Sequence, residues 1–97
     1  ADDLPSRTLS VSASPNPFNP ITEIRFVSPT AGVVTLAIHD VAGRRVRTLL
    51  STDLPAGEHS AKWDGRDDGG RPLPSGTYYA VVRAPAGLTS TSLTLIK

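Results

Sequence analysis

Three carboxylates lie close together in this sequence, at Asp64, Asp67 and Asp68, and they raise the question of metal binding. Carboxylate and carbonyl oxygens on a flexible loop are the ligands that Ca²⁺ prefers in proteins. The EF-hand loop pattern is not present, because Arg66 occupies the third position and no glutamate occupies the twelfth. A weak calcium site at Asp64, Asp67 and Asp68 is therefore one hypothesis, and no other cofactor is expected.

The same segment, residues 63–79, supports a second hypothesis, in which it only turns the chain between two apolar runs. An aspartate such as Asp64 readily accepts hydrogen bonds from the backbone N–H groups that follow it. Gly65, Gly69 and Gly70 can adopt positive φ at no steric cost. We favour this turn over the calcium site.

Residues 15–20 form the next candidate site, because three prolines make this segment rigid and extended around one aromatic residue, Phe18. A rigid segment loses little conformational entropy on binding, so it suits a docking epitope. In the alternative interpretation, Phe18 packs into one end of the core as a plug, and Asn16 and Asn19 bond backbone groups around it. We favour the plug over the epitope.

Catalysis finds little support in the residue types. Cysteine is absent, no Gly-x-Ser-x-Gly segment is present, and Glu23 and Glu58 are the only glutamates. His39 and His59 have no partner at ligand spacing, so a shared zinc site is not expected, and a partly buried, backbone-bonded role is favoured for His59. We therefore expect a protein without enzymatic activity.

The charge of the chain gives no reason to expect a nucleic acid or a membrane as partner. Ten lysines and arginines stand against nine aspartates and glutamates, for a net charge of +1. The basic stretch Arg44-Arg45-Val46-Arg47 lacks the broad face and exposed aromatics of a nucleic-acid site, and it predicts a solvated edge strand. No run approaches the roughly 18 apolar residues that a transmembrane helix needs.

Seven segments with alternating apolar and polar residues predict the elements that position these sites, because successive side chains of a strand point to opposite faces. The expected strands are 8–14, 21–28, 33–40, 44–51, 58–63, 77–84 and 88–96. The segment 77–84 has bulky residues on both faces, which predicts a central strand with cover on both faces. Asp40-Val41-Ala42-Gly43 predicts a tight hairpin turn, since glycine tolerates positive φ and aspartate accepts backbone N–H bonds.

Seven short strands in one chain most simply pack as an all-β, antiparallel sandwich, like that of immunoglobulin or fibronectin type III domains. A length of 97 residues leaves room for one core, so we expect a flexible linker at 1–7 and a single domain at 8–97. The side chains expected to face the core include Leu9, Val11, Ala13, Ile24, Phe26, Val34, Leu36, Ile38, Trp63, Tyr78, Leu93 and Leu95.

Six short motifs follow one another along residues 11–97. They are Asn16-Pro17-Phe18-Asn19-Pro20-Ile21-Thr22, Ile24-Arg25-Phe26, Asp40-Val41-Ala42-Gly43-Arg44, Ala56-Gly57-Glu58-His59, Trp63-Asp64-Gly65 and Ser75-Gly76-Thr77-Tyr78. With these motifs the sequence resembles the C-terminal sorting domains of bacterial cargo proteins of the type IX secretion system. Those domains are immunoglobulin-like modules, similar to the immunoglobulin-like domain of the flagellar hook-capping protein.

The resemblance implies a non-catalytic C-terminal module that sorts a secreted bacterial protein for type IX secretion and attaches it to the cell surface. It implies a secreted or cell-surface location, the outer-membrane secretion machinery or a cell-surface component as partner, and an upstream extracellular domain such as a hydrolase. Two alternatives stay open: a carbohydrate-binding module of a glycoside hydrolase, and a structural assembly domain like that of the hook cap. The expected recognition residues are Asn16, Pro17, Phe18, Asn19, Pro20, Leu93, Leu95 and Lys97.

Overall fold

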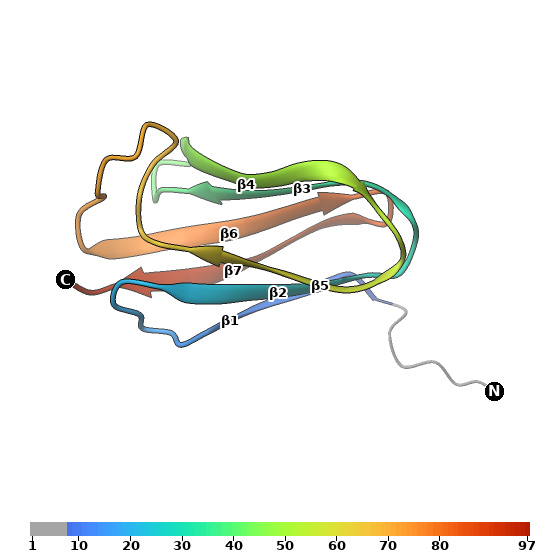
Figure 1. The fold of residues 1–97 in the computed structure, drawn as a ribbon, viewed down its shortest axis with the longest axis horizontal. Helices are drawn as coiled ribbons and strands as arrows, with labels where there is room; N and C mark the ends of the chain where they lie inside the picture. The colour runs from blue at the N-terminus through green and yellow to red at the C-terminus, as the bar shows by residue number, and fades with distance from the viewer. Residues whose placement is uncertain (1–7) are drawn as a thin grey trace.

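The computed structural model describes residues 8–97, which form two antiparallel β-sheets packed face to face (Figure 1). The three-stranded sheet has the order β1-β2-β5, with β1 at Ser10–Ser14, β2 at Thr22–Ser28 and β5 at Gly57–Trp63. The four-stranded sheet has the order β4-β3-β6-β7, with β3 at Gly32–His39, β4 at Arg45–Leu54, β6 at Gly76–Ala84 and β7 at Gly87–Leu95. The predicted seven-stranded, antiparallel immunoglobulin-like sandwich is confirmed.

Two further expectations concern the limits of the chain. The predicted linker at 1–7 lies outside the described residues, so the division into this linker and a domain at 8–97 stays a prediction. Within residues 8–97, no helix is long and apolar enough to cross a bilayer.

The strands form where the sequence alternates. In β2, Ile24 and Phe26 are buried while Arg25 between them is exposed, as a period of two requires. The hairpin between β3 and β4 turns as predicted, because Gly43 adopts a φ of 85° and its N–H donates to the carbonyl oxygen of Asp40 at 3.0 Å. Local sequence therefore determines both the strands and this turn.

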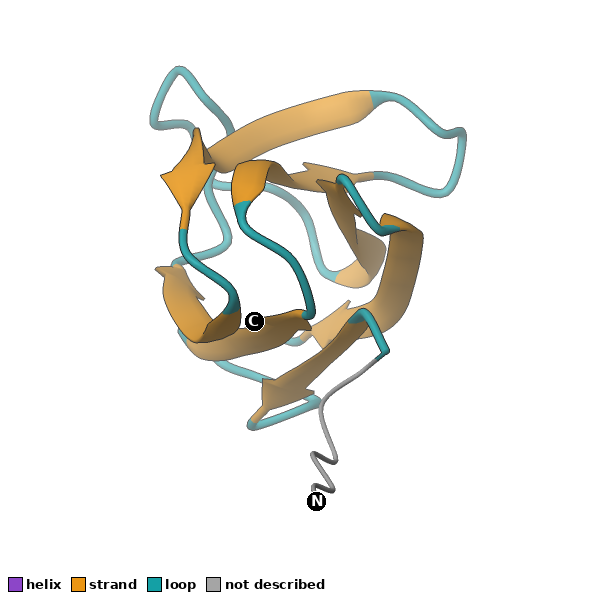
Figure 2. Ribbon diagram, turned by 90° about the vertical axis from the view of Figure 1, so that its right-hand side faces the viewer, coloured by secondary structure: helices purple, strands orange, loops and turns teal. Residues whose placement is uncertain are grey.

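The core lies between the two sheets, which surround it in the end-on view of Figure 2. An aromatic cluster occupies the end of the core where the chain also terminates. The Trp63 ring lies 5.4 Å from the Phe18 ring and 5.5 Å from the Tyr78 ring, measured between centroids. All three side chains are at most 5% exposed. Aromatic packing therefore joins the 15–20 segment, β5 and β6.

The positions of β4 and β6 within the four-stranded sheet test two further predictions. The basic strand β4 does lie at a sheet edge, as predicted. The strand β6 is central within its sheet, but the prediction that both its faces are covered is wrong, because Tyr79 and Arg83 are exposed. A two-layer sandwich covers only the inner face of each sheet, and the outer face of β6 meets solvent.

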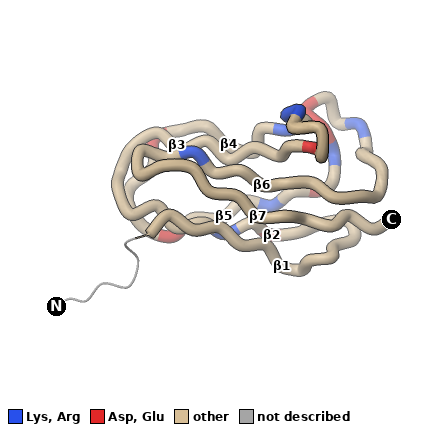
Figure 3. Tube along the Cα trace, turned by 180° about the vertical axis from the view of Figure 1, so that it is seen from behind, with Lys and Arg blue, Asp and Glu red and all other residues tan. Residues whose placement is uncertain are grey.

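One end of the sandwich gathers the segments that the sequence singled out. The 15–21 connection, the β3–β4 hairpin, the 64–75 connection and the C terminus all lie at the left end of Figure 1. Figure 3 shows that many charged residues lie at this end, on the β3–β4 and β5–β6 connections. We call this part of the molecule the loop end.

Candidate functional site

The residues of the 64–72 segment, which we call the acidic turn, bond mainly to one another. The Oδ1 atom of Asp64 accepts the N–H of Arg66 at 3.2 Å. The Oδ1 atom of Asp67 accepts the N–H groups of Gly69 and Arg71, both at 2.9 Å. The turn interpretation is therefore confirmed for Asp64, and Asp67 makes the same kind of contact twice.

The glycines of the acidic turn differ in their backbone conformation. Gly65 and Gly70 have φ values of 78° and 84°, in the left-handed region that favours glycine. Gly69 does not have a positive φ, so the prediction is wrong at that position. Its N–H instead donates to the side chain of Asp67, which any residue type except proline could do.

The guanidinium of Arg47 connects β4 to the acidic turn. Its Nη1 atom donates to the carbonyl oxygens of Arg66 and Asp67, each at 3.3 Å. Arg47 nitrogens also lie 3.6 Å from the carboxylate of Asp64 and 3.9 Å from that of Asp68. Arg47 is therefore not a merely solvated edge cation, as its position in the basic stretch suggested.

The third aspartate, Asp68, covers part of the β4 edge. Its N–H donates to the carbonyl oxygen of Val46, and its Oδ1 atom accepts the N–H of Thr48, both at 3.0 Å. One residue thereby satisfies two backbone groups that an edge strand would otherwise leave open to another chain. The role of Asp68 in this structure is to protect the edge.

The three carboxylates do not converge on one point. Asp67 faces its own turn, Asp68 faces β4 and Arg47, and Asp64 lies on another side of Arg47, beside its Nη1 atom. Within residues 8–97, no group of three histidines, cysteines, aspartates or glutamates is arranged to hold a metal ion. These positions favour the turn interpretation, and calcium binding stays a prediction to be tested.

The proline segment, residues 15–20, runs beside the last strand. The side chain of Asn16 donates to the carbonyl oxygen of Ser92 and accepts the N–H of Thr94, both at 2.9 Å. The N–H of Phe18 donates to the carbonyl oxygen of Thr94 at 2.9 Å, and its carbonyl oxygen accepts the N–H of Ile96 at 3.0 Å. The segment therefore covers the edge of the C-terminal half of β7.

The plug interpretation of Phe18 is confirmed, because its side chain is 2% exposed and packs on Trp63. The recognition role predicted for Phe18, Leu93 and Leu95 needs correction for their side chains, since none is more than 2% exposed and a partner cannot reach them. Asn16, Pro17, Asn19, Pro20 and Lys97 are exposed at the loop end, and their role in recognition stays a prediction.

Two predictions about polar side chains have different outcomes. No hydrogen bond of the Asn19 side chain to residues 8–97 is observed, in contrast to Asn16. His59 is half-buried, and its Nε2 atom lies 2.8 Å from the carbonyl oxygen of Pro55, as predicted.

The second histidine, His39, lies on the other sheet from His59. Its Nδ1 atom lies 3.1 Å from the carbonyl oxygen of Gly43.

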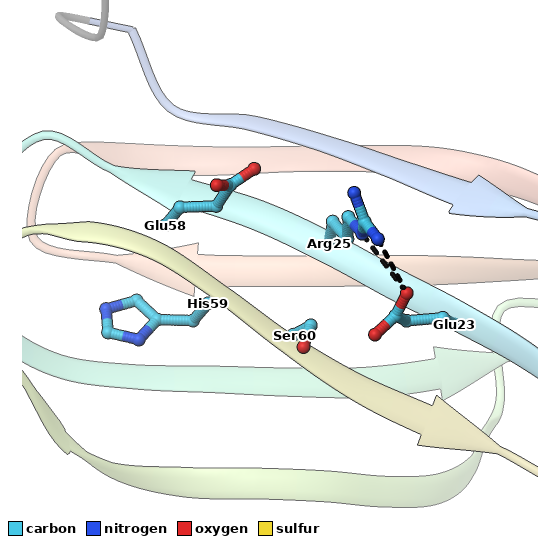
Figure 4. A pocket seen from close by; sticks show the side chains of 5 residues that line it. All are labelled: Glu23, Arg25, Glu58, His59 and Ser60. Carbon is cyan, nitrogen blue, oxygen red and sulfur yellow. Dashed lines mark hydrogen bonds and ion pairs between the residues drawn. The ribbon is translucent and has the colours of Figure 1, made fainter.

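The two glutamates lie on the outer face of the three-stranded sheet. They line a hollow of about 380 Å³ together with Arg25, His59 and Ser60 (Figure 4). The carboxylate of Glu23 lies 3.1 Å from the guanidinium of Arg25 rather than beside Glu58. The hollow therefore presents an ion pair on an open surface and no adjacent pair of carboxylates for acid–base chemistry.

The aromatic residues bear on the carbohydrate-binding alternative. Sugar binding of the kind considered needs two or three exposed coplanar rings, and the chain has five aromatic residues. Phe18, Phe26, Trp63 and Tyr78 are at most 5% exposed, while Tyr79 is 38% exposed. One exposed ring does not make an aromatic platform, so the structure gives this alternative no support.

Two groups at the loop end have shifted pKa values. The backbone N–H of Arg44, which donates to Asp40 Oδ1 at 2.9 Å, holds the pKa of that carboxyl below its ordinary value of 3.8. The N–H of Ala42 bonds the same oxygen at 3.0 Å. Burial raises the pKa of the Tyr78 phenol, whose hydroxyl donates to the carbonyl oxygen of Pro74 at 2.7 Å.

Comparison with known proteins identifies a family. The model of the FlgD Ig-like domain matches residues 22–87. The basal-body rod modification protein FlgD of Salmonella typhimurium is 42% identical over 59 residues, which are 61% of this chain and 25% of that protein. The chain thus spans about a quarter of the length of the curated relatives that it matches.

Solved structures from two bacterial systems have similar folds. One is PorZ, described as an essential surface component of the type-IX secretion system of Porphyromonas gingivalis, with a TM-score of 0.58 and 25% identity. The match covers 90% of this chain and 11% of PorZ. Another is FlgD of Xanthomonas campestris, described in connection with hook capping essential for flagellar assembly, with a TM-score of 0.55 and 28% identity over 87% of this chain and 60% of that one.

Proposed function

Because the chain belongs to the FlgD Ig-like domain family, we propose that it is a non-catalytic, protein-binding module of a longer bacterial protein. The loop end supports this proposal. Hydrogen bonds hold its connections against strand edges, through Asn16 on β7 and through Arg47 and Asp68 on β4. The exposed residues of these connections are therefore held in defined positions. A preorganised surface loses little entropy when a partner binds.

The first candidate function is sorting for type IX secretion and attachment to the cell surface. The observation that carries it is the likeness to PorZ, which covers 90% of this chain but only 11% of that surface protein. A small sandwich domain within a much larger protein is consistent with a module that the secretion machinery recognises, while other domains of the protein carry its activity. The partner would be the outer-membrane secretion machinery or a surface component, and the module would follow an extracellular domain such as a hydrolase.

The surface proposed for recognition is the exposed part of the loop end. Pro17, Asn19 and Pro20 are exposed there, and the N–H of Ile96, next to Lys97, donates to the carbonyl oxygen of Phe18 between them. The N–H of Lys97 donates to the Ser75 hydroxyl at 3.0 Å, which joins the last residue to the connection before β6. Exposed residues from distant parts of the sequence would therefore form one contact surface.

Export of a reporter tests this candidate. A periplasmic reporter fused to the N-terminal side of residues 1–97 is expected to reach the cell surface or medium of a host with a type IX system. Asn19→Arg is expected to reduce export, and Ser60→Arg, at an exposed position on β5, serves as the matched control. Retention of the unmodified fusion in the periplasm would rule the candidate out.

The second candidate function is structural assembly of the kind found in a hook cap. It is favoured by the 42% identity to FlgD of Salmonella typhimurium and by the family match at 22–87. Replacing the matched region of that FlgD with the corresponding residues of this chain tests it. Restored swimming of a strain that lacks FlgD would support the assembly function, and hookless cells with normal levels of the chimera would count against it.

A further inference from the structure

The outer face of the four-stranded sheet contains a hollow with basic side chains at its rim. The hollow has a volume of about 320 Å³, and Thr35, Ala37, His39, Arg45, Val81 and Arg83 line it. Neither glutamate nor aspartate takes part in this lining. His39 and Arg45 flank the β3–β4 hairpin of the loop end, but none of the residues proposed above for recognition, Pro17, Asn19, Pro20 and Lys97, lines this hollow.

Strand register explains why these residues meet. His39 of β3 pairs with Arg45 on one side and Tyr79 on the other. Thr35, four residues earlier on β3, pairs with Arg83 of β6. Ala37 and Val81 pair with each other between these two rows, and they form a low, apolar floor. The two arginines therefore stand at opposite corners of a shallow depression.

Arg45 and Arg83 lack an ion-pair partner in the described part of the chain. Within residues 8–97, no carboxylate lies within ion-pair distance of Arg45 or Arg83, although Arg25, Arg44, Arg47 and Arg66 all have such a partner. Both free arginines are exposed. No ion pair within residues 8–97 therefore engages either arginine of this hollow, although Arg45 also lines a neighbouring hollow with Asp67 and Asp68.

The spacing of the arginines sets the size of a ligand. Four residues along β3 correspond to about 13 Å, and two strand spacings correspond to about 10 Å, so the Cα atoms of Arg45 and Arg83 lie about 16 Å apart. Because side chains of a strand stand roughly perpendicular to the sheet, one small anion would contact one of these two guanidinium groups rather than both. An extended peptide of about five residues covers this distance.

We propose that the outer face of the β4-β3-β6-β7 sheet binds an extended, acidic segment of a partner protein. Arginine forms two parallel hydrogen bonds with a carboxylate, so Arg45 and Arg83 would each hold one acidic side chain. The floor of Ala37 and Val81 accepts an apolar side chain between the acidic ones. Tyr79, 38% exposed beside His39, extends the contact surface with a rigid aromatic ring.

Charge and aromatic content favour a peptide over other anionic partners. Nucleic-acid sites combine a basic groove with several aromatic rings for stacking, and this face has one exposed ring. Anionic membranes attract clusters of four to eight cations, whereas two arginines and a histidine line this hollow and Asp53 lies on the same face of the sheet. A peptide needs only a few well-placed charges and a shallow apolar floor.

A fluorescein-labelled octaglutamate peptide tests the proposal by fluorescence anisotropy with the 97-residue chain at 50 mM and 150 mM salt. We expect saturable binding that weakens with salt, and at least tenfold weaker binding by Arg45→Glu and Arg83→Glu. Lys62→Glu makes the same charge change on the outer face of the other sheet, so it is the matched control and should change the affinity less than twofold. Melting temperatures check that each variant is folded, and Arg83→Ala replaces Arg83→Glu if the latter is not.

Amide chemical shifts locate the binding surface independently. Addition of octaglutamate should move the amide resonances of β3 and β6 around Ala37 and Val81 and leave those of β1 and β2 unchanged. The proposal is overturned by lack of saturable binding at 50 mM salt, by equal losses in Lys62→Glu and Arg83→Glu, or by shifts confined to residues 15–20 and 64–75. It is also overturned if polygalacturonate or phosphatidylserine vesicles bind this face and octaglutamate does not. Reporter export can fail without affecting any of these results, so the two proposals are judged separately.

Discussion

At the scale of single residues, aspartates at the loop end act mainly as acceptors for backbone N–H groups. Asp40, Asp64, Asp67 and Asp68 all accept at least one such bond. Each bond closes a turn or covers a strand edge. The clustered carboxylates that suggested a metal site in the sequence thus have a structural explanation.

Asp40 should make stability depend on pH. Because its folded-state pKa lies below the ordinary value of 3.8, its contribution is fully present above that value and is lost as the pH falls through the lowered pKa. Asp40→Asn removes this titration. We expect the melting temperature of the unmodified chain to exceed that of Asp40→Asn at neutral pH, with the difference shrinking below a pH of about 4. A difference that does not vary between pH 7 and pH 2.5 would contradict the assignment.

Calcium should leave the thermal stability unchanged. A ligand that binds only the folded state raises the free energy of unfolding by RT ln(1 + [L]/Kd), so a real calcium site would raise the melting temperature. We expect no increase with millimolar calcium, because the guanidinium of Arg47 already lies beside the carboxylates of Asp64 and Asp68, and Asp67 accepts two backbone N–H groups. An increase that Asp67→Ala and Asp68→Ala abolish would establish the weak calcium site instead.

At the scale of elements, two segments outside the strands cover edges of the four-stranded sheet. The acidic turn covers β4 through Asp68, and the proline segment covers β7 through Asn16 and Phe18. Open edges pair readily with other chains. These two segments therefore support both the stability of the sandwich and its resistance to aggregation.

Arg47 should matter more for stability than its neighbour Arg45. Arg47→Ala removes two hydrogen bonds and two ion pairs to the acidic turn from a side chain that is 29% exposed. We expect a loss of about 1–2 kcal/mol in the free energy of unfolding. Arg45→Ala, the matched control, should cost less than about 0.5 kcal/mol. Equal losses in urea titrations of the two variants would contradict the role given to Arg47.

Asn16 should hold the proline segment on β7. Asn16→Ala removes one donor and one acceptor to β7, and we expect a loss of about 1–2 kcal/mol in unfolding free energy. Hydrogen exchange at the amides of Thr94 and Ile96 should accelerate as the segment opens more often. Asn19→Ala, at an exposed position in the same segment, should leave both measurements nearly unchanged. Unaltered exchange at Thr94 in Asn16→Ala would count against this contact.

At the scale of the whole molecule, the aromatic cluster joins the two sheets to the loop end. Phe18 and Trp63 come from the proline segment and the three-stranded sheet, while Tyr78 comes from the four-stranded sheet. The Nε1–H of Trp63 also donates to the carbonyl oxygen of Arg66 at 2.9 Å, which joins the acidic turn to the cluster. The exposed residues of the loop end therefore reach their positions only when the core around Trp63 is folded.

Phe18→Ala should destabilise the whole sandwich rather than the loop end alone. Truncation of a buried phenylalanine leaves a cavity and costs about 3–5 kcal/mol. We expect one cooperative transition at a lower temperature, with Trp63 fluorescence and circular dichroism giving the same midpoint. Phe18→Leu should lose less because it fills more of the cavity. Separate midpoints for the two signals would show that the proline segment unfolds on its own.

The sequence by itself determined the strands, the inward residues and the β3–β4 turn. These features depend on alternation and on local turn chemistry, which neighbouring residues carry. Ile24, Phe26 and Trp63 face the core because the period of a strand is two, and Asp40 and Gly43 turn the chain through bonds within five residues. The sequence favoured the plug role of Phe18 but left the docking epitope open, and the burial of its side chain against Trp63 decided between them.

Only the tertiary structure decided which residues meet across the fold. Arg47 reaches the acidic turn about twenty positions later, and Asn16 bonds to residues more than seventy positions away. The hollow beside Arg45 and Arg83 exists because β3 lies between β4 and β6, an order that local patterning does not contain. Contacts of this kind depend on sheet order and register, which the packing of the whole core selects, and so the surfaces proposed for binding emerge only with the fold.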